Sequence, residues 1–242
     1  MKVRRFVLVL AAGFLVAASC GCGLTRQAPP LKQGDRIVFL GDSITAGGGG
    51  KTGYITLVQE AIDAKHKDLA VTTVNADISG NKVPDLQRRL DKDVIAKKPT
   101  VVFIYIGIND VWHWRKTADG TMVGGTPKDQ FEAGLKEIIA RLRPVDARVI
   151  LCTPTTIGEK SDGSNPHDAM LDEYAAISRK VAQESSVQML DLRKAFIDYL
   201  KTHNPDQKDR GILTADSVHL NDAGNRLVAD QMLAALGLAA PK

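Results

Sequence analysis

Short apolar runs alternate along the chain with longer amphipathic segments. The apolar runs are rich in β-branched or aromatic residues and predict strands at 37–40, 70–75, 101–106, 148–152 and 188–191. The amphipathic segments predict helices at about 54–65, 83–97, 128–142, 168–184 and 222–236. Strands that are separated by helices usually form a mainly parallel sheet with helices on both faces. The sequence therefore predicts an α/β fold, built as a three-layer α/β/α sandwich.

The first 19 residues have the three parts of an export signal. Three basic residues precede an apolar run at 6–18, and small residues follow it before Cys20. The run is shorter than the ~20 apolar residues that a membrane-spanning helix needs. We therefore expect the protein to be exported instead of spanning a membrane.

Cys20 is also a candidate site for a lipid anchor. Residues 17–20, Ala-Ala-Ser-Cys, resemble the end of a bacterial lipoprotein signal, in which the cysteine becomes the lipidated first residue of the mature chain. We expect lipidation at Cys20, with Cys22 as a competing candidate and a periplasmic or secreted protein without an anchor as the alternative.

The segment after the signal differs in composition from the rest of the chain. Residues 20–34 contain glycines and prolines and show little apolar periodicity, which is typical of a flexible tether. The length that remains suits a single α/β domain. We therefore divide the chain into a signal at 1–19, a tether at 20–34 and one folded domain at 35–240.

Net charge and cysteine content exclude several classes of protein. The formal net charge of +4 falls by three, to +1, when the three basic residues of the signal are removed, so no nucleic-acid partner is indicated. Two of the three cysteines lie at the signal exit, which leaves Cys152 alone in the body without a disulfide framework. Cysteine and histidine do not occur at metal-binding spacings. The sequence predicts neither a metal nor another cofactor.

A serine follows the first predicted strand. Residues 41–43 are Gly-Asp-Ser, and a glycine turn there sets the next side chain at the carboxyl edge of the sheet, where open α/β proteins bind ligands. Ser43 is therefore a candidate nucleophile, although taken alone it could equally cap the following helix. A hydroxyl is a weak nucleophile, so this interpretation requires a base and hydrogen-bond donors elsewhere in the chain.

Three later segments could supply these groups. Asn109 follows the third predicted strand, and its carboxamide can donate a hydrogen bond to an oxyanion. Gly80 follows the second strand, where a backbone N–H can approach a substrate closely. Asp216 and His219 share one loop, in which the imidazole could take the serine proton and the carboxylate could orient the ring. Each has a plainer alternative as a turn asparagine, a loop glycine or a surface histidine.

Together these segments resemble the sequence blocks of the SGNH hydrolases, the GDSL esterase/lipase group. Gly41 to Ile44 match the first block, with Ile44 where the family name has leucine, and Gly80 matches the glycine of the second. Residues 107–110 match the Gly-x-Asn-Asp of the third block, and residues 216–219 match the Asp-x-x-His of the fifth. The blocks occur in family order and span nearly the whole predicted domain.

The resemblance implies a flavodoxin-like fold with a mainly parallel, five-stranded sheet, and metal-free hydrolysis of carboxylic esters. Ser43 would be the nucleophile, His219 the base and then the acid, and Asp216 the carboxylate that orients the imidazole. The backbone N–H groups of Ser43 and Gly80 and the amide of Asn109 would form the oxyanion hole.

The segment after Asn109 indicates where a substrate would bind. It contains Trp112, His113 and Trp114, whose rings could stack on a sugar or line an acyl groove, or could simply pack the loop down. We place these three residues, and Asp42 beside the serine, among the substrate-binding residues. No long apolar lid segment is evident, so we expect short acyl groups such as acetyl on a carbohydrate. A lysophospholipase or thioesterase, and a carbohydrate-binding protein without catalysis, are the alternatives.

Overall fold

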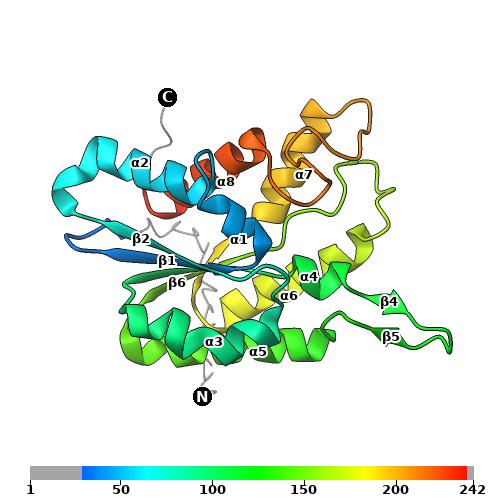
Figure 1. The fold of residues 1–242 in the computed structure, drawn as a ribbon, viewed down its shortest axis with the longest axis horizontal. Coiled ribbons are helices and arrows are strands. Elements are labelled where there is room, and N and C mark those ends of the chain that lie inside the picture. Colours follow the sequence, from blue (N-terminus) through cyan, green and yellow to red (C-terminus); the bar gives the residue numbers. More distant parts are fainter. Residues whose placement is uncertain (1–28, 239–242) are drawn as a thin grey trace, which may run out of the picture.

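A five-stranded parallel sheet forms the centre of the molecule (Figure 1). The computed structural model describes residues 29–238, so the predicted signal and both candidate lipidation sites, Cys20 and Cys22, lie outside the described residues. The strands lie side by side in the order β2 (Thr72–Asp77), β1 (Arg36–Gly41), β3 (Val101–Tyr105), β6 (Arg148–Cys152) and β7 (Gln188–Leu190). Every pairing in this sheet is parallel, which confirms the predicted sheet.

Helices cover both faces of the sheet and give the molecule three layers (Figure 1). One layer holds α2 (Tyr54–His66), α7 (Leu192–His203) and α8 (Asp222–Ala235), and the other holds α3 (Val83–Asp93), α5 (Lys128–Leu142) and α6 (Asp168–Glu184). Two short helices, α1 (Ser43–Gly48) and α4 (Ile108–Trp112), follow β1 and β3, and 3₁₀ turns occupy Lys67–Leu69, Ile95–Lys97 and Arg143–Val145. The predicted three-layer α/β/α sandwich is thereby confirmed.

Several elements differ from the sequence analysis. Helix α7 was not expected, although its residues bury one face through Leu192, Phe196 and Leu200. Asp191, expected to end the last strand, is instead the N-cap of α7, where its side chain accepts a hydrogen bond from the Lys194 N–H. The long helix expected at 83–97 ends at Asp93 and continues only as a 3₁₀ turn, and α1 and α4 are too short to show a period.

The two central strands are buried on both faces because helices lie above and below them. Every side chain of β3 is buried, and in β1 only that of Arg36 is exposed. Phe39 and Phe103 are register partners whose rings stack with centroids 5.1 Å apart. This burial accounts for the unbroken apolar runs in both segments.

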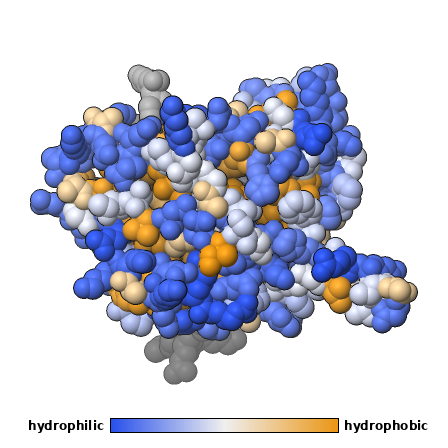
Figure 2. Space-filling view, in the orientation of Figure 1, coloured by the Kyte–Doolittle hydropathy of each residue, from blue (hydrophilic) through white to orange (hydrophobic). Residues whose placement is uncertain are grey.

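A small hairpin projects from this body after α4 (Figures 1 and 2). It consists of β4 (Arg115–Lys116) and β5 (Met122–Val123), which pair antiparallel and were not predicted. Figure 2 shows a face that is mainly hydrophilic, with scattered apolar groups. Within residues 29–238, no helix is both long enough and apolar enough to cross a membrane.

Gly41 ends β1 at the point where the chain turns into α1. A Cβ on this residue would lie 2.0 Å from Thr45 Oγ1 and 2.7 Å from the carbonyl oxygen of Tyr105. The second atom belongs to the neighbouring strand, so it cannot yield without shifting the sheet. A glycine is therefore required directly before the Asp-Ser pair.

We expect Gly41→Ala to lower the free energy of unfolding by about 3 kcal/mol, because the added methyl group would overpack the end of the sheet. Gly47→Ala is the matched control, since a Cβ on Gly47 in α1 would meet no atom within 4 Å. Urea denaturation of both variants measures the difference. Equal stability of the two variants would contradict the packing argument.

Candidate active site

The sheet has a topological switch point between β1 and β3. The chain leaves β1 toward β2 on one side and leaves β3 toward β6 on the other, so a crevice opens beyond the carboxyl ends of these two strands. Ser43 follows β1 directly, and Asn109 lies four residues beyond the end of β3. The two side chains singled out from the sequence thus lie at this edge of the sheet.

Ser43, His219 and Asp216 form a continuous line of hydrogen bonds. His219 Nε2 lies 2.8 Å from Ser43 Oγ, and His219 Nδ1 lies 2.7 Å from Asp216 Oδ2. The carboxylate accepts the Nδ1 proton, which leaves the lone pair of Nε2 to accept the hydroxyl proton of the serine. The structure therefore brings together the three side chains that the sequence analysis assigned to catalysis.

The Asp216 carboxylate is held in its charged form. Partial burial would raise its pKa, but the hydrogen bond from the His219 ring and those from the backbone N–H groups of His219 and Val218 keep the pKa below its usual value. The two backbone bonds converge on Oδ1, at 2.7 and 3.1 Å, and leave Oδ2 to the imidazole. Asp216 is therefore ionised at neutral pH and oriented toward the ring.

A buried carboxylate that the sequence analysis missed supports the loop of Asp216 and His219. Glu159 has no exposed surface, and it accepts hydrogen bonds from the backbone N–H groups of Ile212 and Leu213, both at 2.7 Å. The N–H and the hydroxyl of Thr214 also donate to it. Glu159 lies in a loop rich in polar residues, where no local pattern marks it, so only the distant contact reveals its role.

Ser217, between Asp216 and His219, has a strained backbone. Its φ is +82°, a conformation that residues other than glycine seldom adopt. Its hydroxyl donates to Asp209 Oδ2 at 2.5 Å, and its carbonyl oxygen accepts from the Gly158 N–H at 2.8 Å. The neighbouring loops therefore hold this residue from both sides and keep the imidazole facing the serine.

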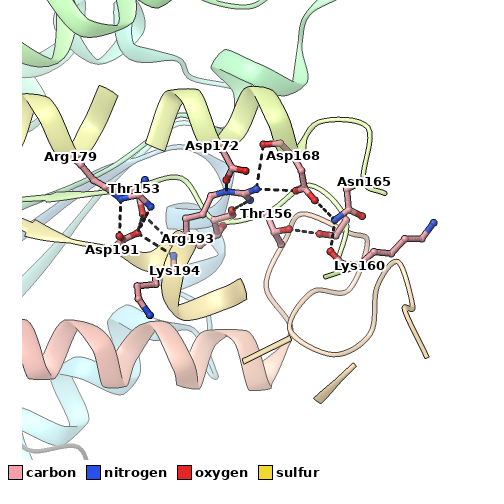
Figure 3. A network of polar contacts seen from close by, with 12 residues as sticks. Thr153, Thr156, Lys160, Asn165, Asp168, Asp172, Arg179, Asp191, Arg193 and Lys194 are labelled. Carbon is pink, nitrogen blue, oxygen red and sulfur yellow. Dashed lines mark hydrogen bonds and ion pairs between the residues drawn. The ribbon is translucent and has the colours of Figure 1, made fainter. Parts of the chain in front are cut away.

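The loop at 153–167, between β6 and α6, is anchored by Arg193 (Figure 3). This guanidinium is almost fully buried, and it donates to Asp172 Oδ1 at 2.6 Å, to Asp168 Oδ1 at 3.0 Å and to the Thr155 carbonyl oxygen at 2.8 Å. Figure 3 shows these contacts between the start of α7, the loop and α6. This loop, which also carries Glu159, is thus tied to the body of the protein.

The backbone N–H groups of Ser43 and Gly80 are both available as donors. Within residues 29–238, neither the Ser43 N–H nor the Gly80 N–H donates a hydrogen bond to another described residue. Gly80 has a φ of +79° and lies in a turn closed by a bond from the Asn81 N–H to the Ile78 carbonyl oxygen. A Cβ on Gly80 would meet no atom within 4 Å, so there is open space beside it.

Asn109 donates to protein groups in this structure. Its Nδ2 lies 3.1 Å from the Asn81 carbonyl oxygen and 3.3 Å from Asp42 Oδ2. The second distance is long for an N–H···O bond, so a substrate oxygen could take over this donor. The amide could therefore act as an oxyanion donor only by exchanging a partner.

Two buried carboxyl groups lie next to Asn109. Asp42 contacts its amide, and Asp110 follows it in the chain. Burial, and to a smaller extent the nearby Asp110, raise the pKa of Asp42 to about 7, despite the hydrogen bond from the Ile44 N–H. Burial also raises the pKa of Asp110 to about 6. Asp42 is therefore partly protonated at neutral pH, which reduces the negative charge next to the Asn109 amide.

The four residues assigned to substrate binding occupy different environments. Trp112 is 40 % exposed at the end of α4, and His113 follows it, half-buried, with its pKa lowered by burial and by Lys82 and Arg115. The Trp114 indole packs against Gly125, and its Nε1 lies 3.5 Å from the Tyr174 hydroxyl. Direct contacts of these three residues with a substrate stay a prediction.

Asp42 requires a correction. The sequence analysis placed it among the substrate-binding residues, but it is only 2 % exposed. Its Oδ1 accepts from the Ile44 N–H at 3.0 Å and its Oδ2 accepts from Asn109. Asp42 therefore supports α1 and the Asn109 amide from beneath, because both of its oxygens face protein donors instead of the crevice.

Comparison with known proteins agrees with this geometry. The model of the GDSL-like lipase/acylhydrolase family matches residues 39–227, well over half of the chain. An acetylxylan esterase from Geobacillus stearothermophilus is 33% identical over 216 residues, which cover 85% of this chain and 95% of that protein.

Solved structures show the same fold. The crystal structure of the acetyl xylan esterase AlAXEase is 45% identical with a TM-score of 0.75, and the match covers 83% of this chain and 98% of that one. LAE5, an alpha/beta hydrolase enzyme from the metagenome of Lake Arreo, Spain, is 31% identical with a TM-score of 0.74, over 86% of this chain and 97% of that one. This chain belongs to the GDSL-like lipase/acylhydrolase family and is a carboxylic ester hydrolase.

Proposed function

We propose that the protein removes short acyl groups, chiefly acetyl, from a carbohydrate through the side chains of Ser43, His219 and Asp216. The observation that carries this proposal is the unbroken line of hydrogen bonds from hydroxyl to imidazole to carboxylate. The N–H groups of Ser43 and Gly80, which have no partners among the described residues, add to it. A protein that only binds carbohydrate has no need of a base paired with a serine hydroxyl.

In the first half of the proposed reaction, Ser43 Oγ attacks the ester carbonyl carbon while its proton passes to His219 Nε2. The carbonyl oxygen takes the electron pair of the double bond and becomes an oxyanion. The N–H groups of Ser43 and Gly80 and the amide of Asn109 stabilise it, and each such donor typically contributes about 3 kcal/mol. The oxyanion then collapses, and the bond to the alcohol breaks as His219 returns the proton to the departing oxygen.

In the second half, a water molecule attacks the acyl group on Ser43. His219 takes one proton from this water, and the same donors stabilise the second oxyanion. When the intermediate collapses, the proton returns to Ser43 Oγ, and a free carboxylic acid leaves. Asp216 remains ionised in both halves and stabilises the imidazolium.

The relatives support these roles. Two solved structures of the Geobacillus stearothermophilus acetylxylan esterase, 31% and 30% identical to this chain, are of catalytic mutants with a serine and a histidine replaced by alanine. Several of the similar proteins are acetylxylan esterases, which favours an acetylated polysaccharide as the substrate class here.

The exposed side chains near the oxyanion donors also suit a sugar. Ile78 lies two residues before Gly80, and Trp112 lies three residues after Asn109, and both are large apolar side chains with about half or less of their surface exposed. An indole that is partly exposed can stack on the apolar face of a sugar ring. We infer that these two side chains form a small apolar rim at the site, which would fit a sugar and a short acyl group better than a long chain.

We also propose that the protein is exported and held at a membrane by a lipid on Cys20. The support is the basic, apolar and small-residue order of the first 19 residues and the proline-containing tether that follows.

We expect Ser43→Ala and His219→Ala each to lower kcat for p-nitrophenyl acetate by about 10⁴-fold or more, because each removes a member of the reacting unit. Ser164→Ala and His203→Ala, on the exposed surface, are matched controls that should retain activity. Thermal unfolding would show that all four variants are folded. Full turnover by Ser43→Ala would refute the assignment.

We expect p-nitrophenyl acetate to be hydrolysed with a kcat/KM at least about tenfold above that for the decanoyl ester, since a chain of that length has only a small apolar rim to bind. Trp112→Ala should weaken hydrolysis of acetylated xylo-oligosaccharides while leaving p-nitrophenyl acetate nearly unchanged. A marked preference for the decanoyl ester would instead favour the lysophospholipase or thioesterase alternative, and absence of labelling by a fluorophosphonate would favour the binding protein.

Expression of the full chain in a bacterium should yield a mature protein that begins at a diacylated Cys20 and sediments with membranes. Mass spectrometry of the N-terminal peptide measures this, and Cys20→Ser is expected to release the protein from membranes, with Cys22→Ser as the matched control. An unmodified mature terminus would reject the anchor.

A further inference from the structure

Arg89 lies beneath the oxyanion donors and contacts three segments of the chain at once. It belongs to α3, and only 10% of its side chain is exposed. Its Nε donates to Asn81 Oδ1 at 2.7 Å, its Nη1 to the Ala76 carbonyl oxygen at 3.0 Å, and its Nη2 to the Gly41 carbonyl oxygen at 2.7 Å. One guanidinium therefore joins the last residue of β1, the end of β2 and the turn that follows β2.

Two of these contacts, those with Gly41 and Asn81, lie close in the chain to proposed oxyanion donors. Gly41 is two residues before Ser43, whose N–H is the first donor. Asn81 directly follows Gly80, whose N–H is the second donor, and Asn81 closes the turn that sets the orientation of Gly80. The carbonyl oxygen of Asn81 also accepts from Asn109 Nδ2, the third donor. Arg89 thus contacts the supports of all three donors and none of the donors themselves.

The chemistry of the guanidinium suits this position. It is planar and always charged, and its N–H groups point in fixed directions, so three acceptors bound to it are held at fixed separations. Asp93 Oδ2, at 3.2 Å from Nη1, balances the charge on the outer side. The Gly41 carbonyl oxygen has one further contact, with the Ile78 N–H at a long 3.4 Å, so Arg89 is its main partner.

We propose that Arg89 is a positioning residue that sets the spacing of the oxyanion donors from Ser43, Gly80 and Asn109. This inference rests on the proposed function, because it assigns Arg89 to the support of that same site. The charge itself is not aimed at the oxyanion: Arg89 acts through the Gly41 carbonyl and through Asn81. Its loss should therefore weaken stabilisation of the transition state and leave binding of the neutral ester nearly unchanged.

Arg89→Gln tests the proposal, and Arg88→Gln is the matched control on the same helix. Arg88 has a side chain that is 70% exposed and pairs only with Asp85 among the described residues. We expect Arg89→Gln to lower kcat for p-nitrophenyl acetate by about 10- to 100-fold with KM changed less than about threefold, as expected for donors displaced by a fraction of an ångström. Arg88→Gln should match the parent protein.

The dissociation constant for phenylboronic acid is a second measurement. It does not change when part of the protein is unfolded, because only folded molecules bind. Boron accepts the Ser43 oxygen and forms a tetrahedral adduct, so its affinity depends on the oxyanion donors. We expect this affinity to fall in Arg89→Gln by a factor similar to that for kcat. Rates are counted per serine that a fluorophosphonate labels at completion, which removes any contribution from unfolded molecules.

Asn81→Ala provides a second test if Arg89→Gln is insoluble. This change removes the Oδ1 acceptor of Arg89 but keeps the backbone carbonyl that accepts from Asn109. We expect a smaller loss of kcat and of boronate affinity, and a double variant no worse than Arg89→Gln alone. Parental kcat per labelled serine and parental boronate affinity, in whichever variant is soluble, would overturn the proposal. Failure of the proposed function is a different outcome, since it appears as full activity in Ser43→Ala.

Discussion

The burial of β1 and β3 side by side is the constraint on which the rest of the structure depends. Because helices cover both faces, the two strands pack through the stacked rings of Phe39 and Phe103, and their carboxyl ends are fixed relative to each other. Gly41 then allows the chain to turn away without a clash against the neighbouring strand. The sheet therefore fixes the distance between Ser43 and Asn109, and it is more rigid than a loop.

The imidazole is held differently, since its loop lies far from the sheet in sequence and precedes α8. Hydrogen bonds to buried charged side chains, instead of strand pairing, hold this loop. Glu159, in the loop at 153–167, accepts hydrogen bonds from three successive backbone N–H groups of the segment before Asp216, and Arg193 connects the same loop to α6. Such buried groups add to stability only when their hydrogen bonds are complete, as they are here, and their directionality fixes the loops more sharply than apolar packing would.

The sequence was sufficient for the sheet and for the main residues of the site, because these follow from local pattern. Long apolar runs and amphipathic segments marked the strands and most helices, and Ser43, Asn109 and His219 each stand at the end of such an element or in a short motif. Asp42 was assigned wrongly, and Glu159 and Arg89 were not assigned at all, since their roles depend on contacts between segments that are distant in sequence. Helix α7 had a readable apolar period at Leu192, Phe196 and Leu200, but the residue that caps it was taken into the preceding strand.

The two hydrogen bonds of the Asn109 amide give the site a way to distinguish charge. In the resting protein this amide is already engaged with the Asn81 carbonyl and, loosely, with Asp42. A neutral ester oxygen competes poorly with the Asn81 carbonyl and Asp42 for the Asn109 N–H groups, whereas an oxygen with a full negative charge competes strongly. In the proposed reaction the Asn109 amide would therefore bind the substrate oxygen only as that oxygen becomes anionic. This hydrogen bond would lower the energy of the transition state without increasing the affinity for the unreacted ester.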